Sequence, residues 1–95
     1  MSKSKGDAAT PHQFTDKYQF EADFRGETLY YLEGGRKASM DWTWTNGYKI
    51  YPASMGYWTN ADGTQTPVSD AERDTIVQRA VKYAQETQGV KLVSE

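Results

Sequence analysis

The chain contains no cysteine and only one histidine among its 95 residues. Small secreted domains usually carry disulfides, so a chain of one-domain length without cysteine indicates a reducing compartment. The sequence also lacks an apolar run long enough for a signal-peptide core or a membrane-spanning helix. We therefore expect a cytoplasmic protein.

Excess charge of one sign is also missing. Lys and Arg together number 11 and Asp and Glu number 13, which leaves a net charge of -2. Such a balance gives no long-range attraction for nucleic-acid phosphates or for anionic lipid. We therefore expect no membrane partner, and the charge disfavours nucleic acid as a partner.

The residue types needed for common catalytic and metal sites are scarce. Without cysteine, and with His12 alone, the usual nucleophile–base pairs are missing. The Gly34-Gly35 pair precedes a strand pattern and not a helix, so it is not a phosphate-binding loop. Residues 60–63 resemble part of a calcium loop, but the later bidentate glutamate is absent and a turn is the better interpretation. We predict no catalytic residue, no metal site and no cofactor.

Residues 1–13 are polar and contain little that a core could bury. This composition predicts a disordered N-terminal tail, followed by a single domain at 14–95. His12 falls in the tail, and we expect its side chain to be solvated.

Aromatic residues make up 14 % of the chain, and many of them alternate with polar residues. Four segments with this two-residue period predict strands, and they lie at about 18–24, 28–32, 38–44 and 48–51. Turn signals at Arg25-Gly26, at Gly34-Gly35 and at 45–47 connect them as hairpins.

The three turns predict mutually consistent registers. They pair Phe20 with Tyr31, Tyr31 with Ala38, and Trp42 with Ile50, all on one face of the sheet. Agreement among three independent turns identifies this face as the buried one.

A helix is predicted at about 70–88. Ser69 and Glu72 match a capping box, an apolar stripe follows at helical spacing, and Gly89 is suited to end the helix. Residues 55–66 are predicted to be a loop, and residues 90–92 could fold back on the domain. The expected fold class is α+β, a four-stranded antiparallel β-meander with one C-terminal α-helix packed on one face.

The second face of this meander has no predicted element to cover it. It carries two tyrosines and a leucine among charged residues, which is typical of a protein-binding patch, although an ordinary wet face is an equal alternative. In the 55–66 loop, two aromatic residues could either close the end of the core or project as binding anchors. The candidate partner-binding residues are Tyr30, Leu32, Lys37, Lys49, Tyr51, Tyr57 and Trp58.

Three segments together resemble a known family. Residues 30–36 (YYLEGGR) resemble a Y-x-E-G-G-R hairpin, and residues 50–58 resemble an I-Y-x-x-S-[IM]-x-x-W segment. Residues 67–76 are similar to a P-[IV]-[ST]-x-x-[ED]-[RK]-x-x-I helix start. In this order the segments resemble a family of small predicted immunity proteins from bacterial polymorphic-toxin systems, although the two tryptophans at 42 and 44 depart from its pattern. The resemblance covers about residues 25–84 and implies neutralisation of a cognate toxin by direct binding, without catalytic residues.

We therefore expect a non-enzymatic protein-binding domain, with a protein partner such as a toxin domain or a second copy of the chain. The alternatives are a module for single-stranded nucleic acid, in which Tyr30, Tyr51 and Trp58 would stack on bases, or a carbohydrate- or peptide-binding module.

Overall fold

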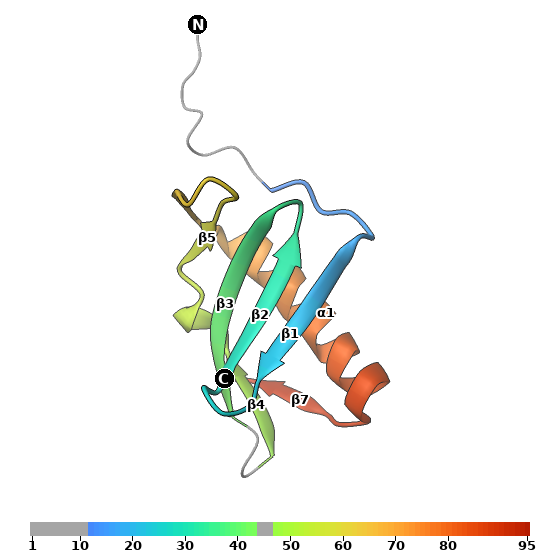
Figure 1. The fold of residues 1–95 in the computed structure, drawn as a ribbon. Helices are drawn as coiled ribbons and strands as arrows, with labels where there is room; N and C mark the ends of the chain where they lie inside the picture. Colours follow the sequence, from blue (N-terminus) through green and yellow to red (C-terminus); the bar gives the residue numbers. More distant parts are fainter. Residues whose placement is uncertain (1–11, 44–46) are drawn as a thin grey trace, which may run out of the picture.

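The computed structural model describes residues 12–43 and 47–95 (Figure 1). In these residues seven strands, a short 3-10 turn and one long helix form an α+β fold. The elements are β1 (Tyr18–Asp23), β2 (Thr28–Glu33), β3 (Arg36–Thr43), β4 (Tyr48–Tyr51), η2 (Pro52–Ser54), β5 (Tyr57–Thr59), β6 (Gln65–Pro67), α1 (Asp70–Gln88) and β7 (Leu92–Ser94). The expected strand position of Trp44 and the turn at 45–46 lie outside the described residues.

The antiparallel order β1-β2-β3-β4 confirms the predicted meander. Phe20 pairs with Tyr31, Tyr31 with Ala38, and Trp42 with Ile50, as the turn lengths require. Gly34 and Gly35 both have positive φ angles, +62° and +79°, which is the backbone of a tight two-residue hairpin.

The predicted number of strands was wrong, because the sheet has seven strands and not four. β3 is eight residues long, and β4 pairs only with its second half, at Asp41–Thr43. The first half of the same edge is taken by β5, with Lys37 opposite Thr59. β5 and β6 form a hairpin inside the segment expected to be a loop, and β7 adds to β4 in parallel.

Helix α1 confirms the predicted capping signals. The Ser69 hydroxyl accepts a hydrogen bond from the Glu72 amide at 3.1 Å, and the Glu72 carboxylate accepts one from the Ser69 amide at 2.9 Å. Gly89 ends the helix in the left-handed conformation, with φ +66°. No helix in the described ranges combines the length and apolar character needed to span a membrane.

α1 crosses behind the sheet and covers one of its faces (Figure 1). Ile76, Ala80 and Ala84 of the helix are buried in one cluster with the inward side chains of the strands. Trp42 is 2 % exposed in this cluster, which confirms its predicted burial. Within the described residues no element covers the opposite side of the sheet, which we call the open face.

Candidate functional site

The open face consists of the side chains that alternate with the buried positions of each strand. The strand registers order these side chains into rows that run across the strands. The rows are Gln19–Leu32–Lys37–Thr59–Gln65 at the hairpin end, Glu21–Tyr30–Ser39 in the middle, and Asp23–Thr28–Asp41–Tyr51 at the far end.

Large exposed apolar side chains concentrate on the open face. Four such residues occur in the described ranges, and three of them, Tyr51, Tyr57 and Val93, lie on this face. Tyr57 is two residues before Thr59 on β5, and Val93 pairs with Lys49, so strand alternation places both on the open side. The fourth, Phe24, contacts Trp42 at the rim of the core, with 5.0 Å between the ring centroids.

β4 and β5 pair with different halves of β3, and we call the point where they diverge the fork. The fork brings Tyr51 and Tyr57 to the same side of the sheet. β4 ends at Tyr51, η2 follows beside β3, and β5 pairs with β3 at Trp58 and Thr59. Ser54 fixes the η2 segment to β3 and to the end of β4. Its hydroxyl accepts a hydrogen bond from the Asp41 amide at 2.7 Å and donates one to the Tyr51 carbonyl at 2.6 Å. The two tyrosines predicted on a sheet and on a loop therefore belong to one surface.

Most of the predicted partner-binding residues lie on the open face. Tyr30 and Leu32 are half-buried at its centre, and the Lys37 ammonium lies 5.1 Å from the centroid of the Tyr30 ring. Lys49 and Tyr51 lie on β4, which pairs with the second half of β3. Val93 was missed, because a three-residue strand leaves no clear alternation in the sequence.

Trp58 does not belong to this surface. Its side chain points to the buried side with Ala38, its pairing partner, and it is 0 % exposed. The expectation that Trp58 binds a partner is therefore wrong for this structure. The alternative, that the segment closes the end of the core, holds for Trp58 and not for Tyr57, which is 50 % exposed.

Trp58 is the centre of a buried polar cluster. Its indole N–H donates to Glu72 Oε1 at 3.2 Å, and the His12 ring stacks on it with 4.2 Å between ring centroids. The Arg36 guanidinium lies 5.3 Å from the indole centroid. His12 is 8 % exposed, so the expectation of a solvated histidine in the tail was wrong. The apolar ring of Phe14 two residues later was the one sequence signal for this packing.

The tautomer of His12 follows from its partners. Arg36 can only donate, so Nδ1 of His12 is the acceptor of the 3.3 Å contact with the guanidinium. Nε2 then carries the proton and donates to Glu33 Oε1 at 3.0 Å. The His12 amide donates to Glu72 Oε2 at 2.6 Å, so both buried glutamates bind the same residue.

Glu33 is buried, and it is held as an anion by its donors. The Thr15 amide and hydroxyl, the Tyr31 hydroxyl and His12 all donate to it, and the Arg79 guanidinium lies 3.6 Å away. Burial would raise the pKa of Glu33, but the hydrogen bonds from Thr15, Tyr31 and His12 outweigh it and lower the pKa to about 2. The carboxylate therefore stays charged at any ordinary pH and ties the N-terminal segment to the sheet.

Tyr31 and Glu72 of the same cluster also have shifted pKa values. Burial, and next the hydrogen bond to Glu33, raise the pKa of the Tyr31 hydroxyl above its ordinary value. Burial would raise the pKa of Glu72, but hydrogen bonds from His12, Ser69 and Trp58 lower it overall. The polar groups of the cluster hydrogen-bond to one another, which indicates that the cluster stabilises the fold.

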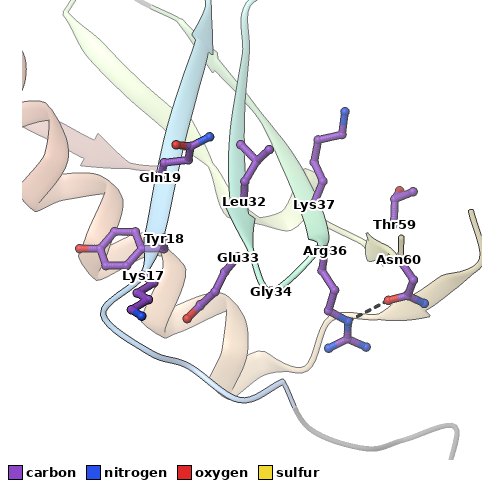
Figure 2. A pocket seen from close by; sticks show the side chains of 11 residues that line it. Lys17, Tyr18, Gln19, Leu32, Glu33, Gly34, Arg36, Lys37, Thr59 and Asn60 are labelled. Carbon is purple, nitrogen blue, oxygen red and sulfur yellow. Dashed lines mark hydrogen bonds between the residues drawn. The ribbon is translucent and has the colours of Figure 1, made fainter. Parts of the chain in front are cut away.

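A hollow of about 610 Å³ lies at the β2–β3 hairpin end of the sheet (Figure 2). Leu32 and Lys37 line it from the open face, whereas Glu33 and Arg36 line it from the side of the polar cluster. Arg36 Nε donates to Asn60 Oδ1 at 2.8 Å, which fixes the β5–β6 hairpin to β3. The polar groups on the inner side of the hollow are thus already bonded within the chain.

Among the described residues, no group of three or more His, Cys, Asp or Glu side chains is placed to hold a metal ion. No protein-family model, curated protein or solved structure matches the chain.

Proposed function

We propose that the chain is a non-catalytic protein-binding domain that binds its partner through the open face. The observation that carries the proposal is the gathering of Tyr51, Tyr57 and Val93 on this one face. A cluster of exposed large apolar side chains on a small domain is typical of an interaction surface.

The composition of the face supports the same function. Tyrosine is enriched among the residues that contribute most to binding at protein interfaces. Tyr30 and Leu32 on β2 lie beside the polar side chains of β3, and Glu21 and Lys49 lie on the strands that flank these two. A face that mixes apolar and charged side chains in this way has the composition of a non-obligate protein interface.

We further propose that the bound protein is a bacterial toxin domain and that binding neutralises it. The support is the resemblance of three segments to predicted immunity proteins, together with the place of those segments in this fold. Glu33 and Arg36, Trp58, and Glu72 come from the three segments, and all meet in the one polar cluster. The residues that this chain shares with the family would then stabilise the fold, while the side chains of the open face would determine which toxin is bound.

The test uses the double variant Tyr51→Ala, Tyr57→Ala. The protein encoded beside this chain is expressed in cells, protection of growth is scored, and the affinity of the purified pair is measured by calorimetry. We expect protection to fail and the binding free energy to weaken by at least ~2 kcal/mol, with the melting curve nearly unchanged.

Phe24→Ala is the matched control, since Phe24 is 42 % exposed but lies off the open face. It should leave protection and affinity intact. If the double variant binds as tightly as the wild type, the open face is not the binding surface.

A further inference from the structure

The centre of the open face sets a large side chain beside a small one. Tyr30 on β2 pairs with Ser39 on β3, and Tyr57 lies on the next strand, β5. Ser39 is exposed, and its side chain is much smaller than those of the two tyrosines, so we expect a low position between them, which we call the notch. A ring beside a notch of this kind can be complementary to a second copy of itself.

The rows of the sheet allow this complementarity to be worked out. A two-fold axis parallel to the strands, between β2 and β3, places β2 over β3 of a second copy and keeps each row in place. β1 then lies over β4 and β5 of the second copy. In the middle row, Tyr30 faces Ser39 of the second copy, and the same contact is repeated on the other side of the axis.

The polar residues fit the same arrangement. Continuing the β3–β5 register by one residue sets Tyr57 beside Ser39 in the middle row. Glu21 then faces Tyr57 of the second copy, and Asp23 faces Tyr51 of the second copy. A tyrosine hydroxyl can donate to a carboxylate, and such charge-assisted hydrogen bonds are strong.

Lys37 faces Leu32 of the second copy. Its ammonium lies over Tyr30 of its own chain, 5.1 Å from the ring centroid, so its aliphatic stem remains available to the leucine. No two like charges face one another in these three rows.

A two-fold axis that runs across the strands along the middle row fails the same comparison. An axis along the middle row would set Glu21 against Glu21 and Tyr30 against Tyr30 of the second copy. Like charges and two large rings would then meet where the first arrangement has a hydroxyl donor and a notch.

We propose that two copies of the chain pair through their open faces about the axis parallel to the strands. The pair is a two-layer sandwich of sheets, with α1 on each outer side. This inference rests on the proposed function, since it uses the same face: pairing covers the apolar face of the free protein, and the partner displaces the second copy.

The size of the face sets the strength of the pair. Four strands about 4.8 Å apart, each with about six residues rising 3.3 Å, give a face of roughly 19 by 20 Å. This is about 380 Å² on each copy, below the roughly 800 Å² per partner of a standard interface, so the pair is weak and its dissociation constant is expected in the upper micromolar range.

The experiment is sedimentation velocity on the full chain across the micromolar concentration range. The wild type should pass from monomer to dimer as concentration rises. Ser39→Tyr fills the notch and should raise the dissociation constant about tenfold or more. The swap Tyr30→Ser, Ser39→Tyr puts ring and notch back in register and should return the constant to near that of the wild type.

Gln78→Tyr, at an exposed position on α1, is the control for an added tyrosine and should change nothing. A wild type that remains monomeric throughout, or a Ser39→Tyr variant that dimerises as the wild type does, overturns the proposal. Should Ser39→Tyr fail to fold by circular dichroism, Ser39→Lys and the wild-type series decide the matter. If the wild type remains monomeric and the Tyr51→Ala, Tyr57→Ala variant still loses its partner, the pairing is refuted and the proposed function stands.

Discussion

The imidazole of His12 stacks on the indole of Trp58, with 4.2 Å between ring centroids and 21° between ring planes. Both rings are buried, and the contact joins the segment before β1 to β5. His12 also bonds to Glu33 on β2 and Glu72 on α1. A single residue of the segment that precedes β1, His12, thus connects the sheet to the helix.

His12→Ala should therefore destabilise the domain. It removes a buried ring and one donor to Glu33, and losses of this kind cost about 2 kcal/mol or more. Chemical denaturation followed by tryptophan fluorescence measures the change. Gln13→Ala, at the exposed neighbour, should stay within about 0.5 kcal/mol of the wild type. Equal stabilities for the two variants would show that the His12 contacts contribute nothing.

Stability should depend on the charge of Glu33 at acid pH. Its pKa is lowered from 4.5 to about 2 in the folded protein. A lowered pKa means that the folded state favours the ionised form, so the contribution is fully present above pH 4.5 and is lost as the pH falls towards 2. The loss amounts to about 3 kcal/mol at most.

Glu33→Gln separates this effect from the general loss of stability in acid. The variant should be less stable at pH 7, because an amide has only one acceptor oxygen and cannot accept from both Thr15 and Tyr31, which bond to different oxygens of Glu33. Its unfolding free energy should fall less steeply than that of the wild type between pH 5 and 2, which is the range that the shifted pKa sets. Parallel pH profiles for the two proteins would contradict the assignment.

The local part of the fold could be predicted from the sequence. The Gly34-Gly35 turn fixes the pairing of Tyr31 with Ala38, and Ser69 with Glu72 fixes the start of α1. These features depend on residues close together in the chain, where turn and capping chemistry is decisive. The three-residue strands could not be predicted in the same way, because β5 and β7 are too short for alternation to show. β7 pairs with β4 across more than forty residues, and no local pattern encodes that contact.

The site could be predicted only in part, for the same reason. Strand alternation placed Tyr30, Leu32 and Tyr51 on one face, and their registers hold. Trp58 was misplaced because its direction depends on pairing with β3, which the loop prediction left out. His12 was misplaced because its partners, Glu33 and Glu72, lie 21 and 60 residues away.

Glu27 is a site of backbone strain in the β1–β2 turn. It has φ +53°, the left-handed region that most side chains avoid and asparagine tolerates. Glu27→Asn should therefore stabilise the domain by about 0.5–1 kcal/mol, read from the thermal midpoint. Glu21→Asn, on the exposed side of β1, offers no such relief and should be neutral or mildly destabilising. A decrease in stability for Glu27→Asn would show that the glutamate side chain itself is needed in the turn.

Ser54 is expected to control the open face without being part of it. Its hydroxyl joins the Asp41 amide of β3 to the Tyr51 carbonyl, just where β4 and β5 diverge. Ser54→Ala leaves both groups without this partner, and since the site is exposed, water replaces it at a cost of only about 1 kcal/mol. The η2 turn then loses this hydrogen bond to β3, and the spacing of Tyr51 and Tyr57 is held less firmly. Self-association, measured by sedimentation, should weaken although no side chain of the face has changed. Ser54→Thr keeps the hydroxyl and should restore both stability and association. If Ser54→Ala associates as tightly as the wild type, the fork does not position the two tyrosines.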